Sequence, residues 1–236
     1  MHIRLKILFL TFLLLCHAGL SFGQESNNTY KTYPGAKMIK LSQPNYKGMP
    51  VEEAIKKRRS ARSYSKKALT LPQLSQLLFA AQGITGSVSG FGLRAAPSAG
   101  ALYPIEVYLV VNNVEELPRG IYHYNVQKHA LELLKEGDFR KEITNAGLWQ
   151  DTLGEANVTF VLSAVFERTQ KKYRDRSIRY IYMEAGHISQ NISLQAVSLG
   201  LGSVSVGAFY DEQVNSLIGL DGSRESTIYL QAVGTL

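Results

Sequence analysis

One long amphipathic segment in the C-terminal third of the chain constrains the fold more than any other feature. Between about Arg176 and Leu199, apolar side chains recur at steps of three and four residues, at positions 178, 181, 185, 188, 192, 196 and 199. This spacing places them on one face of a helix of about six turns. Gly200 and Gly202 follow the last apolar position and predict where the helix ends.

The rest of the chain mixes strands with shorter helices. Ile105–Val111 and Val158–Val165 are apolar runs that predict buried strands. Because strands and helices do not alternate regularly, the pattern predicts an α+β fold in one domain. Trp149, the single tryptophan, is expected to pack in the core. A hairpin is expected at 121–124 with 130–134, and a last strand at 227–233. Four shorter helices are expected at 50–57, 72–83, 138–146 and 211–218, and a glycine-rich loop at 86–92.

The first residues are organised like a secretory signal peptide. Arg4 and Lys6 precede a short apolar run over 7–15, and the small residues Ser21 and Gly23 offer a cleavage site. The apolar run is too short for a stable membrane span. We therefore expect residues 1–23 to be removed and the protein to be exported, as a periplasmic or secreted product.

The single cysteine, Cys16, lies in this leader. A lipoprotein anchored at Cys16 is the alternative, but Leu15 stands where a lipobox normally has a small residue. Without Cys16 the mature chain has no disulfide, zinc–thiolate site or cysteine nucleophile. Residues 24–48 are polar and predict an extended arm, and 49–236 form the expected domain.

The net charge and the spacing of the histidines limit the classes of ligand that the chain is expected to bind. The formal net charge of +7 falls to +5 when Arg4 and Lys6 are removed with the leader, and this modest basic excess is compatible with an anionic cofactor. Nucleic-acid binding is not expected, because the basic residues are not interleaved with aromatic residues as in known modules. The histidines at 123, 129 and 187 do not have metal-ligand spacing, so no metal site is expected.

Three segments could contact a cofactor. The first contains Arg58, Arg59, Ser60 and Arg62, since guanidinium groups bind phosphate oxygens in a bidentate fork. The alternative is a solvated basic face, because four lysines surround this segment.

The second segment is Pro97-Ser98-Ala99-Gly100, where small residues would let a flat ligand approach the backbone. A tight turn leading into the strand at Ile105 is equally compatible.

The third segment, Gly200–Gly207, contains Val204, Ser205 and Val206. It lacks the Lys-Ser/Thr of a P-loop, and a helix precedes it where a dinucleotide-binding fold has a strand. A glycine-rich turn against a ligand and a simple helix cap both remain open.

A fourth segment pairs Lys172 with Tyr173. A lysine beside a tyrosine can act as an acid/base couple if burial or neighbouring cations lower the lysine pKa. Basic segments next to helices are common, so this pair indicates little by itself.

Taken in order, these segments resemble the flavin-dependent nitroreductase family, in particular its SagB-type branch, which includes azoline dehydrogenases. The resemblance covers roughly 50–234 and includes Glu184-Ala-Gly-His187 and Gln190-Asn191 on the long helix. It implies a central mixed or antiparallel sheet flanked by helices, an intertwined homodimer, and one FMN per subunit at the interface.

The resemblance also implies a role for each segment. Arg58, Arg59, Ser60 and Arg62 would hold the FMN phosphate, ribityl chain and pyrimidine edge. Pro97, Ser98, Ala99 and Gly100 would contact the flavin from the partner subunit. Val204, Ser205, Val206 and Gly207 would lie along the isoalloxazine edge, and Lys172 with Tyr173 would be the catalytic dyad.

The expected activity is hydride transfer between a small molecule, of azoline, nitro or quinone type, and flavin N5. An NAD(P)H-dependent nitro- or quinone reductase is the other enzymatic interpretation. An exported flavin- or ligand-binding protein without turnover is the non-enzymatic alternative.

Overall fold

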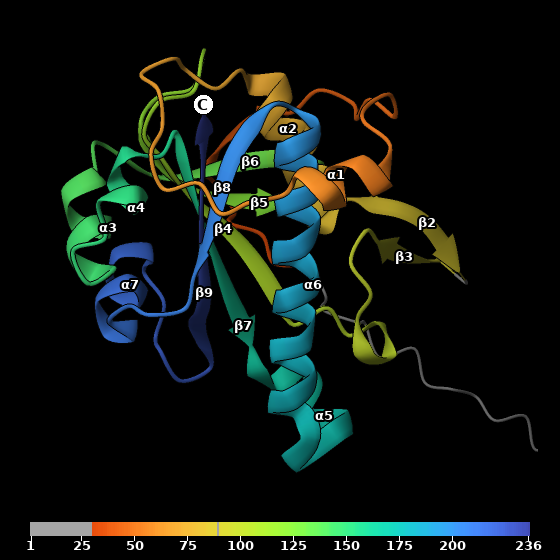
Figure 1. Ribbon diagram of the computed structural model, residues 1–236. Coiled ribbons are helices and arrows are strands. Elements are labelled where there is room, and N and C mark those ends of the chain that lie inside the picture. The colour runs from red at the N-terminus through yellow and green to blue at the C-terminus, as the bar shows by residue number, and fades with distance from the viewer. Residues whose placement is uncertain (1–29, 89) are drawn as a thin grey trace, which may run out of the picture.

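A computed structural model describes residues 30–88 and 90–236 (Figure 1). Its centre is a seven-stranded sheet in the order β1-β6-β5-β4-β7-β9-β8, in which all neighbours are antiparallel. The predicted α+β fold is therefore confirmed. The expected signal peptide, 1–23, lies outside the described residues. The strands are β1 Lys37–Lys40, β2 Ile84–Val88, β3 Phe91–Arg94, β4 Ile105–Val111, β5 Gly120–Asn125, β6 Ala130–Glu136, β7 Val158–Val165, β8 Leu201–Val206 and β9 Glu225–Thr235.

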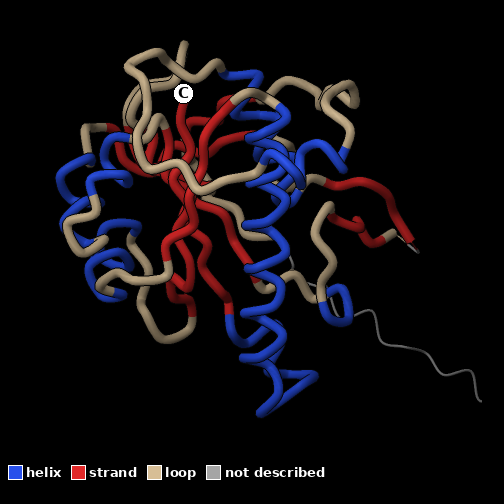
Figure 2. The backbone as a smooth tube through the Cα atoms, viewed as in Figure 1, coloured by secondary structure: helices blue, strands red, loops and turns tan. Residues whose placement is uncertain are grey.

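Helices cover both faces of this sheet, which gives three layers (Figures 1 and 2). One apolar core contains side chains of α2 and α6, and a second contains side chains of α3, α4 and α7 on the other side of the sheet. Strand β4 serves both, because its side chains alternate between the two faces and all seven residues are buried. The helices are α1 Val51–Lys57, α2 Leu71–Gln82, α3 Arg140–Ala146, α4 Asp151–Glu155, α5 Phe166–Tyr173, α6 Ser177–Ser198 and α7 Asp211–Ile218, with short 3₁₀ turns η1 Ala99–Ala101 and η2 Arg174–Arg176.

The long helix α6 has 22 residues and forms as the apolar spacing predicts. Ile181, Ile188 and Ile192 are fully buried in the first core, and they lie on one face of the helix. The helix stops before Gly200, whose φ of +70° lies in the left-handed region that glycine adopts without strain. Side chains on the outward face of α6 stay exposed, including Tyr182 and Met183.

The described part of the N-terminal segment is tied to the sheet. Strand β1 pairs with β6 through the register Lys37↔Leu133 to Lys40↔Ala130. Before it, Lys31 forms an ion pair with Glu225 at the start of β9. Among the described residues, no helix is long and apolar enough to cross a membrane.

Two sequence-based expectations are wrong. The glycine-rich stretch 86–92 was expected to be a loop, but it belongs largely to a hairpin of β2 and β3, with Val88 opposite Phe91. Glycine and serine have low strand propensity, so backbone pairing rather than side-chain pattern makes this hairpin. Trp149 was expected in the core, but it is 66% exposed and packs edge-on against Tyr210.

Candidate functional site

The basic segment after α1 lies along the edge strand β8. Ser60 and Ser203 form a parallel bridge, and the Ala61 N–H donates a 3.0 Å hydrogen bond to the Ser203 carbonyl. A Cβ at Gly202 would lie 2.7 Å from the Ala61 Cβ, so this close approach of the two backbones requires glycine. The structure thus brings together the first and third segments identified in the sequence.

The arginines of this segment differ in what they contact. Arg59 donates from Nη1 to the carbonyls of Lys56 and Arg58, at 3.1 and 2.7 Å, and so caps the end of α1. Arg58 is half-buried, and Arg62 is exposed. We call residues 58–62 together with β8 the cationic ledge, because a segment with three arginines lies beside a glycine-containing edge strand there.

The β8 part of the ledge offers mainly backbone. Val204 and Val206 are buried in the second core, so their side chains do not face a ligand. Ser205 points to the other side of the strand, where its Oγ lies 2.7 Å from the Ser189 Oγ of α6. Gly207 is exposed, and a Cβ there would meet only the Tyr229 ring at 3.7 Å. A flat group could therefore approach β8 through Ser205, Gly207 and the main chain.

The second segment forms the tight turn η1 before β4. The Ser98 Oγ accepts a 2.9 Å hydrogen bond from the Tyr103 N–H and closes the turn. Gly100 has φ +65°, in the left-handed region. A Cβ at Gly100 would lie 2.9 Å from both the Lys172 Nζ and the Tyr173 hydroxyl. The second and fourth segments, far apart in sequence, are therefore in contact.

The Lys172–Tyr173 pair lies at the end of α5. The Lys172 Nζ is 5.5 Å from the centre of the Tyr173 ring, which suits a cation–π contact. The Tyr173 ring packs edge-on against Tyr180 of α6, with ring centres 4.8 Å apart. Lys172 is exposed and Tyr173 half-buried, so both polar ends can reach a bound molecule.

Glu184 of α6 has no role assigned by sequence reasoning, yet it is buried behind η1 with 2% exposure. Burial raises the pKa of its carboxyl to about 7, against hydrogen bonds from Ser98, Gln82 and the Ile105 N–H and the charge of Arg94. Among the described residues its Oε1 has no hydrogen-bond partner. The sequence does contain a signal for Glu184: it is a carboxylate on the apolar face of the long helix, three residues after Ile181.

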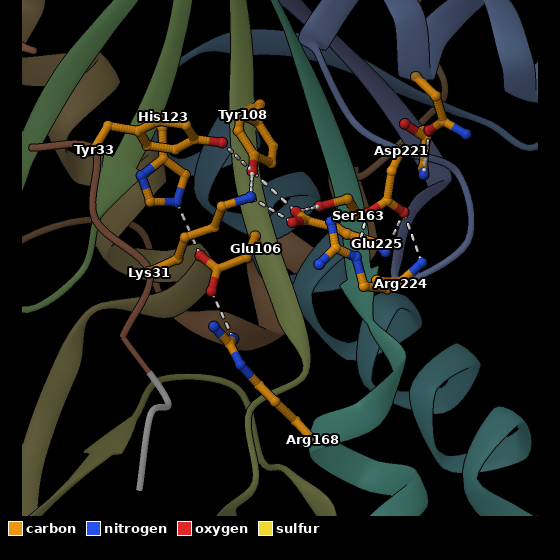
Figure 3. A network of polar contacts seen from close by, with 12 residues as sticks. Lys31, Tyr33, Glu106, Tyr108, His123, Ser163, Arg168, Asp221, Arg224 and Glu225 are labelled. Carbon is orange, nitrogen blue, oxygen red and sulfur yellow. Dashed lines mark hydrogen bonds and ion pairs between the residues drawn. The ribbon is translucent and has the colours of Figure 1, made fainter. Parts of the chain in front are cut away.

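Sequence reasoning also missed a buried ionic chain, of which Figure 3 shows Arg168, Glu106 and His123. Glu106 of β4 pairs with Arg168 of α5 at 2.6 Å and with the His123 Nε2 at 2.9 Å. The His123 Nδ1 lies 2.8 Å from Glu132. Burial opposes charge on His123, but its hydrogen bonds to Glu106 and Glu132 prevail and raise its pKa. We call Arg168, Glu106, His123 and Glu132 the ionic chain.

The ledge and the turn contact different parts of α6. Ser98 of the turn contacts Glu184, whereas Ser205 of the ledge contacts Ser189, further along the helix. Figure 1 shows η1 and α5 beside the half of α6 that begins the helix, and α1 beside its other end. A groove of about 260 Å³ lies next to α1, between α2 and the last turns of α6, lined by Met49, Val51, Ala54, Ala80, Ala95, Asn191, Leu194, Gln195 and Ser198.

The chain is similar to known proteins in sequence and in fold. The model of the nitroreductase family matches residues 55–235. A nitroreductase homologue of Methanocaldococcus jannaschii is 38% identical over 196 residues, which are 83% of this chain and 96% of that protein. In a solved complex of Escherichia coli microcin synthetase McbBCD with truncated pro-MccB17, one chain matches with a TM-score of 0.65 and 26% identity, over 87% of this chain and 77% of that chain. A Desulfovibrio desulfuricans protein solved with FMN shares the fold, with a TM-score of 0.55 and 22% identity over 79% of this chain and 86% of that chain.

Proposed function

Because the chain belongs to the nitroreductase family, we propose that it is an FMN-dependent oxidoreductase that transfers a hydride between a small molecule and flavin N5. The observation that carries this proposal is the contact of Gly100 with Lys172 and Tyr173. It puts a candidate proton-transfer pair against the turn that we expect to contact the flavin. In support, one protein with the same fold was solved with FMN.

The chemistry of the ledge fits FMN. Guanidinium and hydroxyl groups are good phosphate donors, and Arg58, Arg62 and Ser60 supply both within one short segment beside β8. An isoalloxazine ring needs a backbone without bulky side chains, and Ser205 with Gly207 supplies it. These features fit a site for a flat, anionic cofactor better than they fit a merely solvated basic face.

A homodimer would complete the site. Within one chain, the turn and the ledge contact different parts of α6. The exposed face of α6 carries the large apolar side chains of Ile178, Tyr182 and Met183, which monomers seldom expose together. We infer that two copies pair through this face in a twofold dimer, with the turn of one subunit near the ledge of the other.

In the proposed mechanism, bound FMN supplies the centre that accepts or donates the hydride. Arg62 would supply positive charge to the pyrimidine edge, since the Arg59 guanidinium already donates to two carbonyls. Lys172 and Tyr173 would hold or transfer the accompanying proton at the ammonium nitrogen and the phenol oxygen. The turn at Gly100 would orient the substrate side of the site and exclude water from it.

We favour a dehydrogenase acting on a carbon acid of azoline type. The likeness to a chain of the microcin synthetase complex supports this class, as does the Lys172–Tyr173 pair. An NAD(P)H-dependent nitro- or quinone reductase is the second candidate, favoured by the likeness to the M. jannaschii homologue. With the signal peptide expected at 1–23, either enzyme would act after export.

The test is the visible absorbance of the mature chain, from Gln24 onward, before and after FMN is added. We expect flavin bands that stay with a dimer on a sizing column and are released as FMN on denaturation. A dimer that takes up no FMN at any concentration would contradict the proposal and favour a protein without turnover. Rapid bleaching by NADH or NADPH would identify the reductase, and slow bleaching with oxidation of an azoline substrate would identify the dehydrogenase.

A further inference from the structure

The ionic chain ends on the helix that carries the candidate proton-transfer pair. Arg168 precedes Lys172 by four residues, so it lies one turn earlier on about the same side of α5. Its guanidinium forms the 2.6 Å ion pair with Glu106, and its Nη1 donates a 2.9 Å hydrogen bond to the Tyr103 carbonyl. Tyr103 is the second residue after η1, next to Leu102. One side chain thus connects α5, β4 and the turn.

The other inward contacts of α5 include Phe166, the first residue of the helix, which packs partly buried against the first core. Thr169 is its only buried residue, and Glu167 and Lys171 pair with each other on the solvent side at 2.9 Å. Tyr173 contacts Tyr180, but this contact lies at the last residue of the helix. Between the two ends of α5, Arg168 supplies the ion pair and the hydrogen bond that tie the helix to β4 and to the turn.

His123 and Glu132, at the other end of the ionic chain, keep Glu106 in its charged form. Both ring nitrogens of His123 face carboxylate oxygens, at 2.8 and 2.9 Å, and only an imidazolium can donate to both. Burial by itself would favour neutral Glu106, but the His123 hydrogen bond and the Arg168 charge prevail and lower its pKa. A charged Glu106 gives Arg168 a fixed, buried anchor that water does not screen.

We propose that Arg168, anchored by Glu106, is a positioning residue that holds α5 in the register that places Lys172 and Tyr173 against Gly100. The role of the pair in proton transfer rests on the proposed function, whereas the positioning of α5 does not. Arg168 acts through the helix and is not itself placed in the flavin site.

Two measurements on the FMN-loaded full mature chain test this role. The first is amide hydrogen exchange of residues 166–173 in Arg168→Ala and Arg168→Lys. We expect exchange of α5 to rise by about tenfold or more in Arg168→Ala, because the helix loses its ion pair with Glu106 and its hydrogen bond to Tyr103. Arg168→Lys keeps a cation for Glu106 and should show a smaller rise. Gln170→Ala changes an exposed side chain of the same helix and should leave exchange nearly unchanged.

The second measurement is a double-mutant cycle of turnover with Lys172→Ala. Arg168→Ala should lower kcat roughly tenfold to a hundredfold in the parent chain and change it little when Lys172 is already alanine. FMN affinity should not change in either variant.

The outcomes separate the two proposals. Unchanged exchange of α5 in Arg168→Ala would overturn the positioning role, whatever happens to turnover. Equal losses of kcat with and without Lys172 would also overturn it, since Arg168 would then act by another route. Full turnover of Lys172→Ala would contradict the proposed function of the pair, while raised exchange of α5 would still support its positioning by Arg168. If Arg168→Ala does not fold, the same exchange measurement on Arg168→Lys tests the positioning role: raised exchange of α5 would support it, and unchanged exchange would overturn it.

Discussion

A Cβ atom on Gly100 would lie 2.9 Å from the ammonium nitrogen of Lys172, closer than real Cβ atoms approach such an atom without a shift. The turn before β4 and the end of α5 are therefore matched to each other. Because Gly100 also has φ +65°, both the backbone and the neighbouring side chains favour glycine at this position.

Gly100→Ala should thus affect turnover more than stability. The added methyl group would displace the Lys172 and Tyr173 side chains, and a shift of this size in a proton-transfer group commonly costs roughly tenfold or more in kcat. The positive φ should add about 1 kcal/mol of destabilisation. Steady-state kinetics and urea unfolding measure the two effects. Gly86→Ala is the matched control, since a Cβ there meets nothing within 4 Å and φ is not positive. Equal kinetic effects of the two variants would contradict the match between turn and helix.

The arginines of the cationic ledge should control FMN binding. Removing Arg58 or Arg62 deletes a charge-assisted contact to the phosphate, which corresponds to about tenfold to a hundredfold weaker binding for each. The double variant should lose its yellow colour on gel filtration. Fluorescence titration with FMN measures the affinities. Arg119→Ala is the control, because Arg119 pairs with Asp138 at the surface at 3.0 Å. A double variant that stays fully yellow would refute the assignment of the ledge.

Stability should fall with rising pH because of Glu184. Its folded pKa of about 7 lies above the usual value of 4.5, so the folded state holds the proton more tightly than the unfolded state does. The stability gained from the neutral form is full below about pH 4.5 and is lost as pH rises through 7. The loss has an upper bound of about 3 kcal/mol.

Glu184→Gln removes this titration while keeping the size of the side chain. We expect the wild type to lose stability relative to this variant between pH 5 and pH 8, as measured by urea unfolding. His123 changes stability in the same direction, but it is present in both proteins and cancels in the difference. A difference between the two proteins that does not vary with pH would show that Glu184 does not titrate in this range.

The N-terminal segment should contribute to stability through Lys31. This residue pairs with Glu225 and donates a 2.6 Å hydrogen bond to the Tyr108 hydroxyl (Figure 3). Lys31→Ala would leave the largely buried Glu225 without its cation, although Tyr108 still donates to it at 2.9 Å. We expect a loss of about 1–3 kcal/mol in the free energy of unfolding. Lys40→Ala, at an exposed position of β1, should lose less than about 0.5 kcal/mol. Equal losses would show that the ion pair adds nothing.

The amino-acid sequence determined the elements whose cause is local. Apolar residues three and four apart predict α6, because a helix face follows from neighbouring residues alone. The strands β4 and β7 follow from continuous apolar runs in the same way. The four candidate segments could also be identified, because the chemical properties of arginine, glycine and proline do not depend on where the fold places them.

Only the tertiary structure decided which of these segments meet. The contact of Gly100 with Lys172 depends on how α5 packs against α6, and that of Ser60 with Ser203 depends on the place of β8 at the edge of the sheet. Helix α5 has one buried residue and so has no apolar pattern to reveal it. The ionic chain was hidden for another reason: its four residues lie on different elements. Burial and their mutual hydrogen bonds, which only the fold creates, shift the pKa values of Glu106 and His123.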